Sequence, residues 1–159
     1  MINGNTNGIK QYILDEMELI YSHQCGANEF ISPTLIDFLA KYTSLLGKEI
    51  SIYLSRAGRV LDVSIGDSDH VSLPYVRKRR GLQGLSGVRC IHTHPGGSSQ
   101  LSSVDIGTLL SSRLDSMAAL AVRDGEAKSL QAGFLGETLT QPVLYGPYSI
   151  HRIPNAYFM

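Results

Sequence analysis

The segment that most constrains the fold covers residues 88–105 and reads VRCIHTHPGGSSQLSSVD. Pro95 cannot donate a hydrogen bond to a sheet, and it disfavours the helical conformation at His94, so a strand formed by VRCIHTH should end there. Glycines and serines then provide a flexible connection. Ser102 is a favourable N-cap, and Asp105 follows it at the spacing of a capping box. The segment therefore predicts a strand, a short loop and a helix.

The same segment places three metal-binding side chains within reach of one another. Side chains two residues apart on a strand share a face, so the imidazoles of His92 and His94 should lie roughly 7 Å apart along it. The loop and one helical turn can bring the carboxylate of Asp105 over that face. Three nitrogen or oxygen ligands, with a fourth position left for water, are typical of catalytic zinc. We therefore expect a Zn²⁺ site at His92, His94 and Asp105.

Two alternatives stay open at this point. Asp105 can simply cap the helix and complement its dipole, while both histidines are ordinary strand residues. Cys90 has the same parity as His92 and His94, and a thiolate is a good zinc ligand, so these three residues form a rival set. The alternative reading of Cys90 is a small, buried apolar residue.

The rest of the chain predicts a mixture of helices and strands. Apolar spacing and capping residues predict helices at about 8–24, 33–46 and 105–117, and strands at about 49–54, 59–65, 117–122, 129–135 and 142–145. Arg56, Ala57 and Gly58 should form a hairpin turn, with Gly58 free to take a positive φ. This order predicts an α+β fold with α/β/α layers, in which helices flank a mixed, largely antiparallel sheet.

Composition limits the classes of function. The 159 residues are 43% hydrophobic and 18% charged, with a formal net charge of zero. This predicts one domain over residues 1–159 with a single core, and no global field that favours nucleic acid or membranes. The polar start and the lack of a long apolar run predict a cytoplasmic protein without a secretory leader or membrane span. Cys25 and Cys90 give no case for a disulfide framework.

The spacing of the motif resembles a known signature. His92-Thr93-His94-Pro95, six residues, Ser102, two residues and Asp105 look like the pattern of JAMM (JAB/MPN) metalloproteases. The resemblance implies an MPN fold, a cytidine-deaminase-like architecture, over about residues 33–145. It also implies that His92, His94 and Asp105 bind zinc, and that Ser102 donates to the oxyanion or to the bound water.

Such enzymes also need a glutamate as general acid/base, carried at the start of the first strand after a helix. Glu49 occupies that place, because the predicted 33–46 helix stops at Gly47 and a strand follows. The alternative for Glu49 is a solvated carboxylate paired with Lys48. The acidic residues that do not stand at a helix-to-strand junction are weaker candidates: Glu29, Asp62 and Asp67.

A wider likeness covers most of the chain. Residues 58–74, the Arg-Arg-Gly of 79–81 and residues 85–122 are similar to the N-terminal extension of HflX-type GTPases from Firmicutes, a ribosome-associated family. The GTPase domain is absent from these 159 residues. They contain no phosphate-binding G-x-x-x-x-G-K-[ST] loop, because Gly47-Lys48 is followed by Glu49, so we expect no nucleotide site.

One basic run suggests a partner. Arg77, Lys78, Arg79 and Arg80 can contact phosphates of ribosomal or other RNA, although such a run is more often a solvated surface. Tyr53, Tyr75 and Tyr145 are expected to be packing residues.

Three functions follow from these features. The first is zinc-dependent hydrolysis of a peptide or isopeptide bond, with Glu49 activating water and Ser102 assisting. The second is a non-catalytic interaction domain of an HflX-type GTPase. The third is a metal-dependent deamidase or nucleoside-type hydrolase that uses the same ligands.

Overall fold

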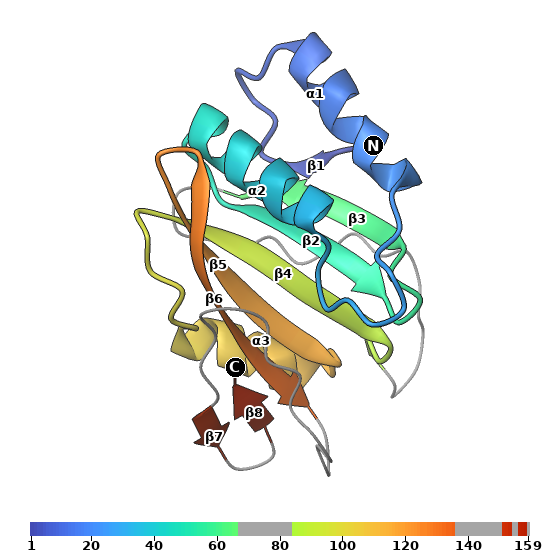
Figure 1. Cartoon of the computed structure of the whole chain (residues 1–159), viewed down its shortest axis with the longest axis vertical. Coiled ribbons are helices and arrows are strands. Elements are labelled where there is room, and N and C mark those ends of the chain that lie inside the picture. The colour runs from blue at the N-terminus through green and yellow to red at the C-terminus, as the bar shows by residue number, and fades with distance from the viewer. Residues whose placement is uncertain (67–83, 136–150, 154–155, 159) are drawn as a thin grey trace.

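The computed structural model describes residues 1–66, 84–135, 151–153 and 156–158, and its strands form one sheet (Figure 1). The eight described strands have the order β1-β3-β2-β4-β5-β6-β8-β7. The pairs β1–β3 and β4–β5 are parallel, and the other pairs are antiparallel. The strands are β1 (Asn3–Gly4), β2 (Ile50–Ser55), β3 (Val60–Ile65), β4 (Val88–Pro95), β5 (Ser116–Arg123), β6 (Glu126–Leu135), β7 (His151–Ile153) and β8 (Ala156–Phe158).

The helices are α1 (Gln11–Glu18), a 3₁₀ turn η1 (Leu19–Ser22), α2 (Pro33–Leu46) and α3 (Ser103–Ser112). Local sequence explains the bounds of α2. The hydroxyl of Ser32 accepts a hydrogen bond from the backbone N–H of Leu35, Pro33 stands at the first turn, and Gly47 ends the helix with φ of 62°. The prediction for 33–46 is confirmed. The N-terminal helix is shorter than the predicted 8–24, and its N-cap, Lys10, offers no side-chain hydrogen bond.

Helices cover both faces of the sheet. α2 packs on one face, where its Leu35 and Leu39 meet Ile52, Ile91 and Leu120 of the strands. On the opposite face Leu109 of α3 packs with buried side chains that include Tyr53, Cys90 and Met117. Figure 1 shows α2 in front of the strands and α3 behind β6. The predicted α+β fold, with helices flanking a mixed and mostly antiparallel sheet, is confirmed.

Two predicted boundaries differ from the structure. The helix expected over 105–117 ends at Ser112, because Arg113 adopts a left-handed conformation with φ of 55° and Asp115 is held by Arg56 outside the helix. Pro95 belongs to β4 as its last residue, one position beyond the predicted end. The hairpin between β2 and β3 is confirmed, and Gly58 has φ of 79°.

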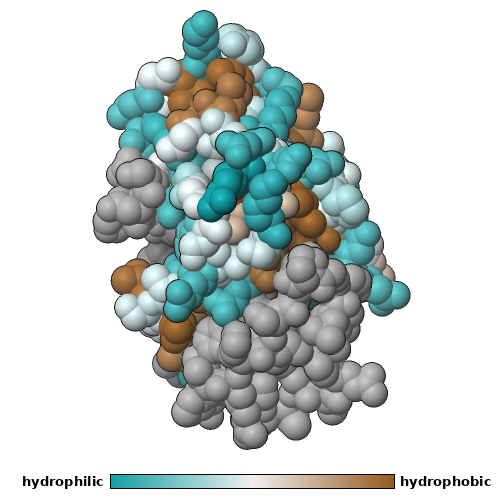
Figure 2. Space-filling model, turned by 60° about the vertical axis from the view of Figure 1, so that its left-hand side comes forward, coloured by the Kyte–Doolittle hydropathy of each residue, from teal (hydrophilic) through white to brown (hydrophobic). Residues whose placement is uncertain are grey.

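Some predictions lie outside the described residues: the strand at 142–145, the basic run of Arg77 to Arg80, and Asp67, Tyr75 and Tyr145. Tyr53 is fully buried, as expected of a packing residue. None of the described helices is long and apolar enough to cross a membrane. On the face shown in Figure 2, hydrophobic residues form separate areas between hydrophilic ones.

Candidate metal centre

Strand β4 presents its two histidines on the face that carries α3. Cys90 packs in the hydrophobic cluster of that face, and His92 and His94 share its parity. The intervening Ile91 and Thr93 face α2, where the Thr93 hydroxyl lies 2.6 Å from that of Thr43. His92 is fully buried, and His94, nearer the end of the strand, is partly exposed. The alternation predicted from the sequence is therefore observed.

The loop after β4 turns the chain back over this face. Gly96 and Gly97 have φ of 104° and 90°, values that strain other residues. A Cβ atom on Gly97 would also lie only 2.7 Å from the guanidinium of Arg123, whose Nη2 donates to the carbonyl of Gly96. The two glycines thus allow the tight turn that leads to Ser102 and the start of α3.

A capping box orients Asp105 at the first turn of α3. Its Oδ2 atom accepts hydrogen bonds from the backbone N–H of Ser102 at 2.8 Å and from the Ser102 hydroxyl at 2.7 Å. In return the N–H of Asp105 donates to the hydroxyl oxygen of Ser102 at 3.1 Å. This arrangement occupies one carboxylate oxygen and leaves Oδ1 directed towards His92, at 3.4 Å from its Nε2 atom.

The three side chains converge at a spacing that suits one metal ion. The Nε2 atoms of His92 and His94 are 3.0 Å apart, and the ligand atoms of His92, His94 and Asp105 all lie within 4.8 Å of one another. Bonds of about 2.0–2.1 Å in a tetrahedron hold two ligand atoms about 3.3 Å apart. The His92–His94 and His92–Asp105 separations of 3.0 and 3.4 Å are close to this value, so His92 can share one ion with either neighbour.

The protonation states of Asp105 and His94 at neutral pH also favour binding of a cation. Burial opposes the charge on Asp105, but its interactions with His92 and Ser102 outweigh burial and lower the pKa of Asp105 to about 2. Burial and the neighbouring His92 lower the pKa of His94, and the hydrogen bond to the Ser98 carbonyl opposes them only in part. At neutral pH the site therefore offers a carboxylate and a neutral His94 imidazole, the forms in which these residues bind metals.

The partner of Nδ1 in each histidine determines the tautomer of the ring, and so whether Nε2 has a free lone pair for a metal. Nδ1 of His94 lies 3.0 Å from the carbonyl oxygen of Ser98, to which it can donate, and this tautomer leaves Nε2 with a free lone pair. Nδ1 of His92 is buried and has no hydrogen-bond partner among the described residues. The support around His94 is thus the pattern of a metal ligand, whereas the polar contacts of His92 are made by its Nε2 atom, to Asp105 and His94.

Glu49 immediately precedes β2 and is buried, with 7% of its surface exposed. Its carbonyl accepts the N–H of Gly66, and Ser51 pairs with His92 across β2 and β4. Glu49 stands two residues before Ser51 and has the same parity, that of the face that carries His92. The alternative of a solvated carboxylate is wrong, because Glu49 is buried. Its role in proton transfer stays a prediction.

The other residues singled out in the sequence have structural surroundings of their own. Burial raises the pKa of the Cys90 thiol to about 12, partly offset by Tyr53, and Cys90 is outside the metal-binding group. Glu29 accepts a hydrogen bond from the N–H of Gly26. Asp62 accepts one from Asn3 at 2.5 Å, and burial raises its pKa. Because its thiol is buried and lies outside the cluster, Cys90 is a small buried residue, as in the alternative to a zinc ligand.

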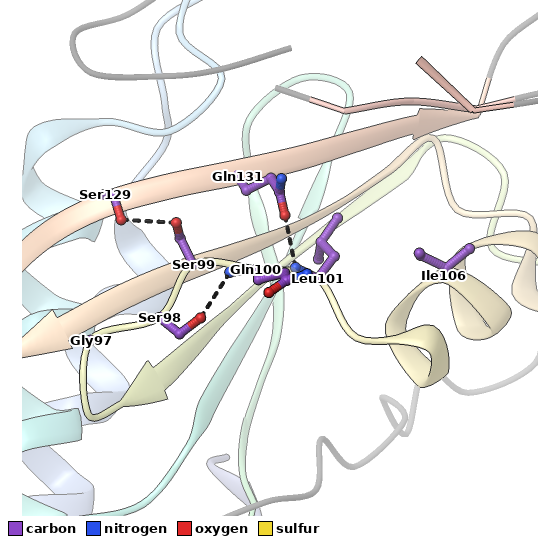
Figure 3. Close-up of a pocket in the computed structure, with 8 residues that line it drawn as sticks. All are labelled: Gly97, Ser98, Ser99, Gln100, Leu101, Ile106, Ser129 and Gln131. Atoms are coloured by element: carbon purple, nitrogen blue, oxygen red, sulfur yellow. Dashed lines mark hydrogen bonds between the residues drawn. The ribbon is translucent and has the colours of Figure 1, made fainter. Parts of the chain in front are cut away.

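The loop that holds His94 through the Ser98 carbonyl also lines a groove of about 630 Å³ (Figure 3), which has none of the three candidate ligands in its described lining. One wall is the loop that follows Gly97, and the facing wall is β6, with Ile106 of α3 at one end. Ser129 donates to the hydroxyl of Ser99, and the N–H of Leu101 donates to Gln131, so the loop is fixed to β6. Ser129 and Gln131 are lining residues without a motif of their own in the sequence; the available signal was their position two residues apart on one strand, which places them on the same face.

Comparisons with known proteins do not identify the chain. It matches no known protein family, and no curated protein matches it. A solution structure of a protein from Salinibacter ruber is similar at 16% sequence identity and a TM-score of 0.36, over 73% of this chain and 91% of that one. A likeness at this level carries no argument about function.

Proposed function

We propose that this chain is a zinc-dependent hydrolase that cleaves peptide or isopeptide amide bonds. The observation that carries the proposal is the convergence of His92, His94 and Asp105, whose ligand atoms all lie within 4.8 Å of one another. The resemblance of the motif to that of JAMM metalloproteases points to the same chemistry. The three side chains supply two nitrogens and one oxygen, which leaves a fourth tetrahedral position for water.

A bound zinc ion would polarise the scissile carbonyl and lower the pKa of its water towards neutrality. Glu49 would accept the proton of the attacking water and would pass it to the leaving amine. Its burial favours such a role, because a carboxyl removed from bulk water keeps the transferred proton within the site.

Ser102 has two roles in the proposal. Its hydroxyl donates to Oδ2 of Asp105 and so holds the carboxylate in place for the metal. Rotation of the same hydroxyl towards a developing oxyanion is the role that the resemblance implies. The groove can hold an extended segment, because its hydroxyl and amide side chains complement the donors and acceptors of a polypeptide backbone.

The test combines metal analysis with hydrolysis of linear and lysine-branched peptides. Glu49→Gln keeps the shape of the residue and should retain zinc, but it should lose about 10²–10⁴-fold in turnover. Glu29→Gln is the matched control, because Glu29 is a partly exposed carboxylate that accepts the N–H of Gly26, and this variant should retain activity. Wild-type protein that holds no zinc after metal-replete purification would overturn the proposal.

Zinc binding without hydrolysis of any peptide would instead favour a non-catalytic role, such as an interaction domain of an HflX-type GTPase. Equal activity of wild type and Glu49→Gln would remove Glu49 from the mechanism.

A further inference from the structure

A second cavity lies at the opposite end of β4 from His94 and on the opposite face of the sheet. It has a volume of about 210 Å³. Arg89, Ser116 and Phe134 line it from neighbouring positions on β4, β5 and β6, where the strand register pairs Arg89 with Ser116 and Ser116 with Phe134. Phe30, from the segment that precedes α2, forms the wall over these strands. The metal centre contributes no residue to this cavity.

Arg89 carries the uncompensated charge of the cavity. Its Nε atom is buried and has no hydrogen-bond partner in the described part of the chain. Burial lowers the pKa of Arg89, with Cys25 and Asp115 opposing the effect. The Cys25 thiol is only a weak acceptor. Within the described residues the Arg89 guanidinium has only this weak hydrogen-bond acceptor, so an anion in the cavity that Arg89 lines would supply a stronger one.

The other charged residues of the cavity neutralise each other. Arg56 donates from Nε to one oxygen of Asp115 at 2.6 Å and from Nη2 to the other at 3.0 Å. The second of these oxygens also accepts the backbone N–H of Gly87 at 2.9 Å. Since Asp115 is occupied by Arg56 and Gly87, the described residues of the lining retain one positive charge, that of Arg89.

Aromatic rings give the cavity an apolar side. The ring centroids of Phe30 and Phe134 are 5.5 Å apart, and the Arg89 guanidinium lies 5.6 Å from the Phe30 centroid. The volume is below the roughly 300–1,000 Å³ of sites for drug-sized ligands, which restricts an occupant to a small molecule. A single positive charge in a planar guanidinium matches the two oxygens of a carboxylate.

We propose that this cavity binds a small organic carboxylate with a flat apolar body. The carboxylate accepts hydrogen bonds from Arg89, the Ser116 hydroxyl adds a further donor, and the body packs against Phe30 and Phe134. Phosphate is a poorer match, because its higher charge and three acceptor oxygens need more donors than these side chains provide.

The test is an amide-resolved NMR titration with benzoate, and with benzamide as the uncharged compound of nearly the same shape. Benzoate should shift the backbone signals of Gly87, Arg89 and Phe134, with an affinity at least about 10-fold higher than that of benzamide, since only benzoate forms the charge-assisted pair. Equal affinities, or shifts that map elsewhere, would overturn the proposal.

Arg89→Met removes the charge while keeping an apolar stem of similar length, and it should abolish the preference for benzoate. Arg59→Met, at an exposed position of the neighbouring hairpin, is the matched control and should bind as the wild type does. A folded Arg89→Met protein with wild-type affinity for benzoate contradicts the proposal. If that variant does not fold, the comparison of benzoate with benzamide on the wild type decides alone.

Discussion

At the scale of single residues, the two oxygens of the Asp105 carboxylate have different partners. Asp105 uses Oδ2 to accept the N–H and the hydroxyl of Ser102, and its Oδ1 faces His92. The capping alternative and the metal-ligand reading of Asp105 are therefore compatible, because each uses a different oxygen. The cap fixes the side chain in the orientation that a metal ligand requires.

Because Ser102 caps α3 and also holds Asp105, Ser102→Ala should lower both the stability of the fold and the affinity for zinc. Loss of the cap should lower the free energy of unfolding by about 1 kcal/mol, and loss of the support to Asp105 should weaken zinc binding by about 10–100-fold. Urea denaturation and calorimetric zinc titration measure the two effects. Ser103→Ala, at the next position of the same turn, is the control. If stability falls and zinc affinity does not, Ser102 is only a helix cap.

At the scale of elements, a buried hydroxyl pair joins α2 to the strands that carry the site. The Thr93 hydroxyl lies 2.6 Å from that of Thr43 on α2, and it accepts the N–H of Ile50 at 2.9 Å. Ile50 begins β2 and directly follows Glu49, so this pair fixes the helix, the start of β2 and the histidine strand relative to one another.

Thr93→Val keeps the shape of the side chain and removes these hydrogen bonds. It should lower the free energy of unfolding by about 1–3 kcal/mol, because the buried N–H of Ile50 loses its acceptor. Thr34→Val, at an exposed position of α2, is the control and should change the free energy of unfolding by less than about 0.5 kcal/mol. Equal effects of the two substitutions in thermal or urea unfolding would show that the pair does not join the elements.

Elements with local signals were predictable from the sequence, and those fixed by distant contacts were not. Ser32, Pro33 and Gly47 determine the ends of α2 within the helix itself. The end of α3 lies at Arg113, which adopts a left-handed conformation that an arginine does not indicate in the sequence. Strand β1 escaped prediction because its two residues are defined by parallel pairing with β3.

The convergence of His92, His94 and Asp105 was predictable because these residues lie within one strand–loop–helix segment, where parity and capping determine the direction of each side chain. The groove beside it was not, because Ser129 and Gln131 reach it from β6 through the sheet register.

At the scale of the whole molecule, the two ends of β4 differ in chemistry. His92 and His94 gather towards one end on the face of α3, and Arg89 lies near the other end on the face of α2. Near the Arg89 end, the pair of Arg56 and Asp115 joins the β2–β3 turn to the start of β5. The contribution of this ion pair to the free energy of unfolding should therefore depend on pH.

Burial raises the pKa of Asp115, but the hydrogen bonds from Arg56 and Gly87 outweigh burial, and the net shift is downward. A carboxyl with a lower pKa in the folded state stabilises the fold above its unfolded pKa of about 3.9, and this contribution is lost as pH falls through the folded value. Asp115→Asn should thus lower stability by roughly 1 kcal/mol at pH 7, since the pair is partly exposed, and by less in acid.

Urea denaturation of wild type and Asp115→Asn at neutral and acidic pH measures this difference. Asp15→Asn, on the exposed side of α1, controls for the loss of a carboxylate elsewhere. A difference between wild type and Asp115→Asn that stays constant or grows as the pH falls would contradict the assignment.

The most direct test of the metal centre is a crystal structure after zinc soaking, with anomalous data collected at the zinc absorption edge. The proposal predicts an anomalous peak about 2.0–2.2 Å from His92 Nε2, His94 Nε2 and Asp105 Oδ1. It also predicts that Glu49 lies near the fourth position of that ion without binding it. Soaked crystals that show no peak between these three side chains, or only peaks elsewhere, would contradict it.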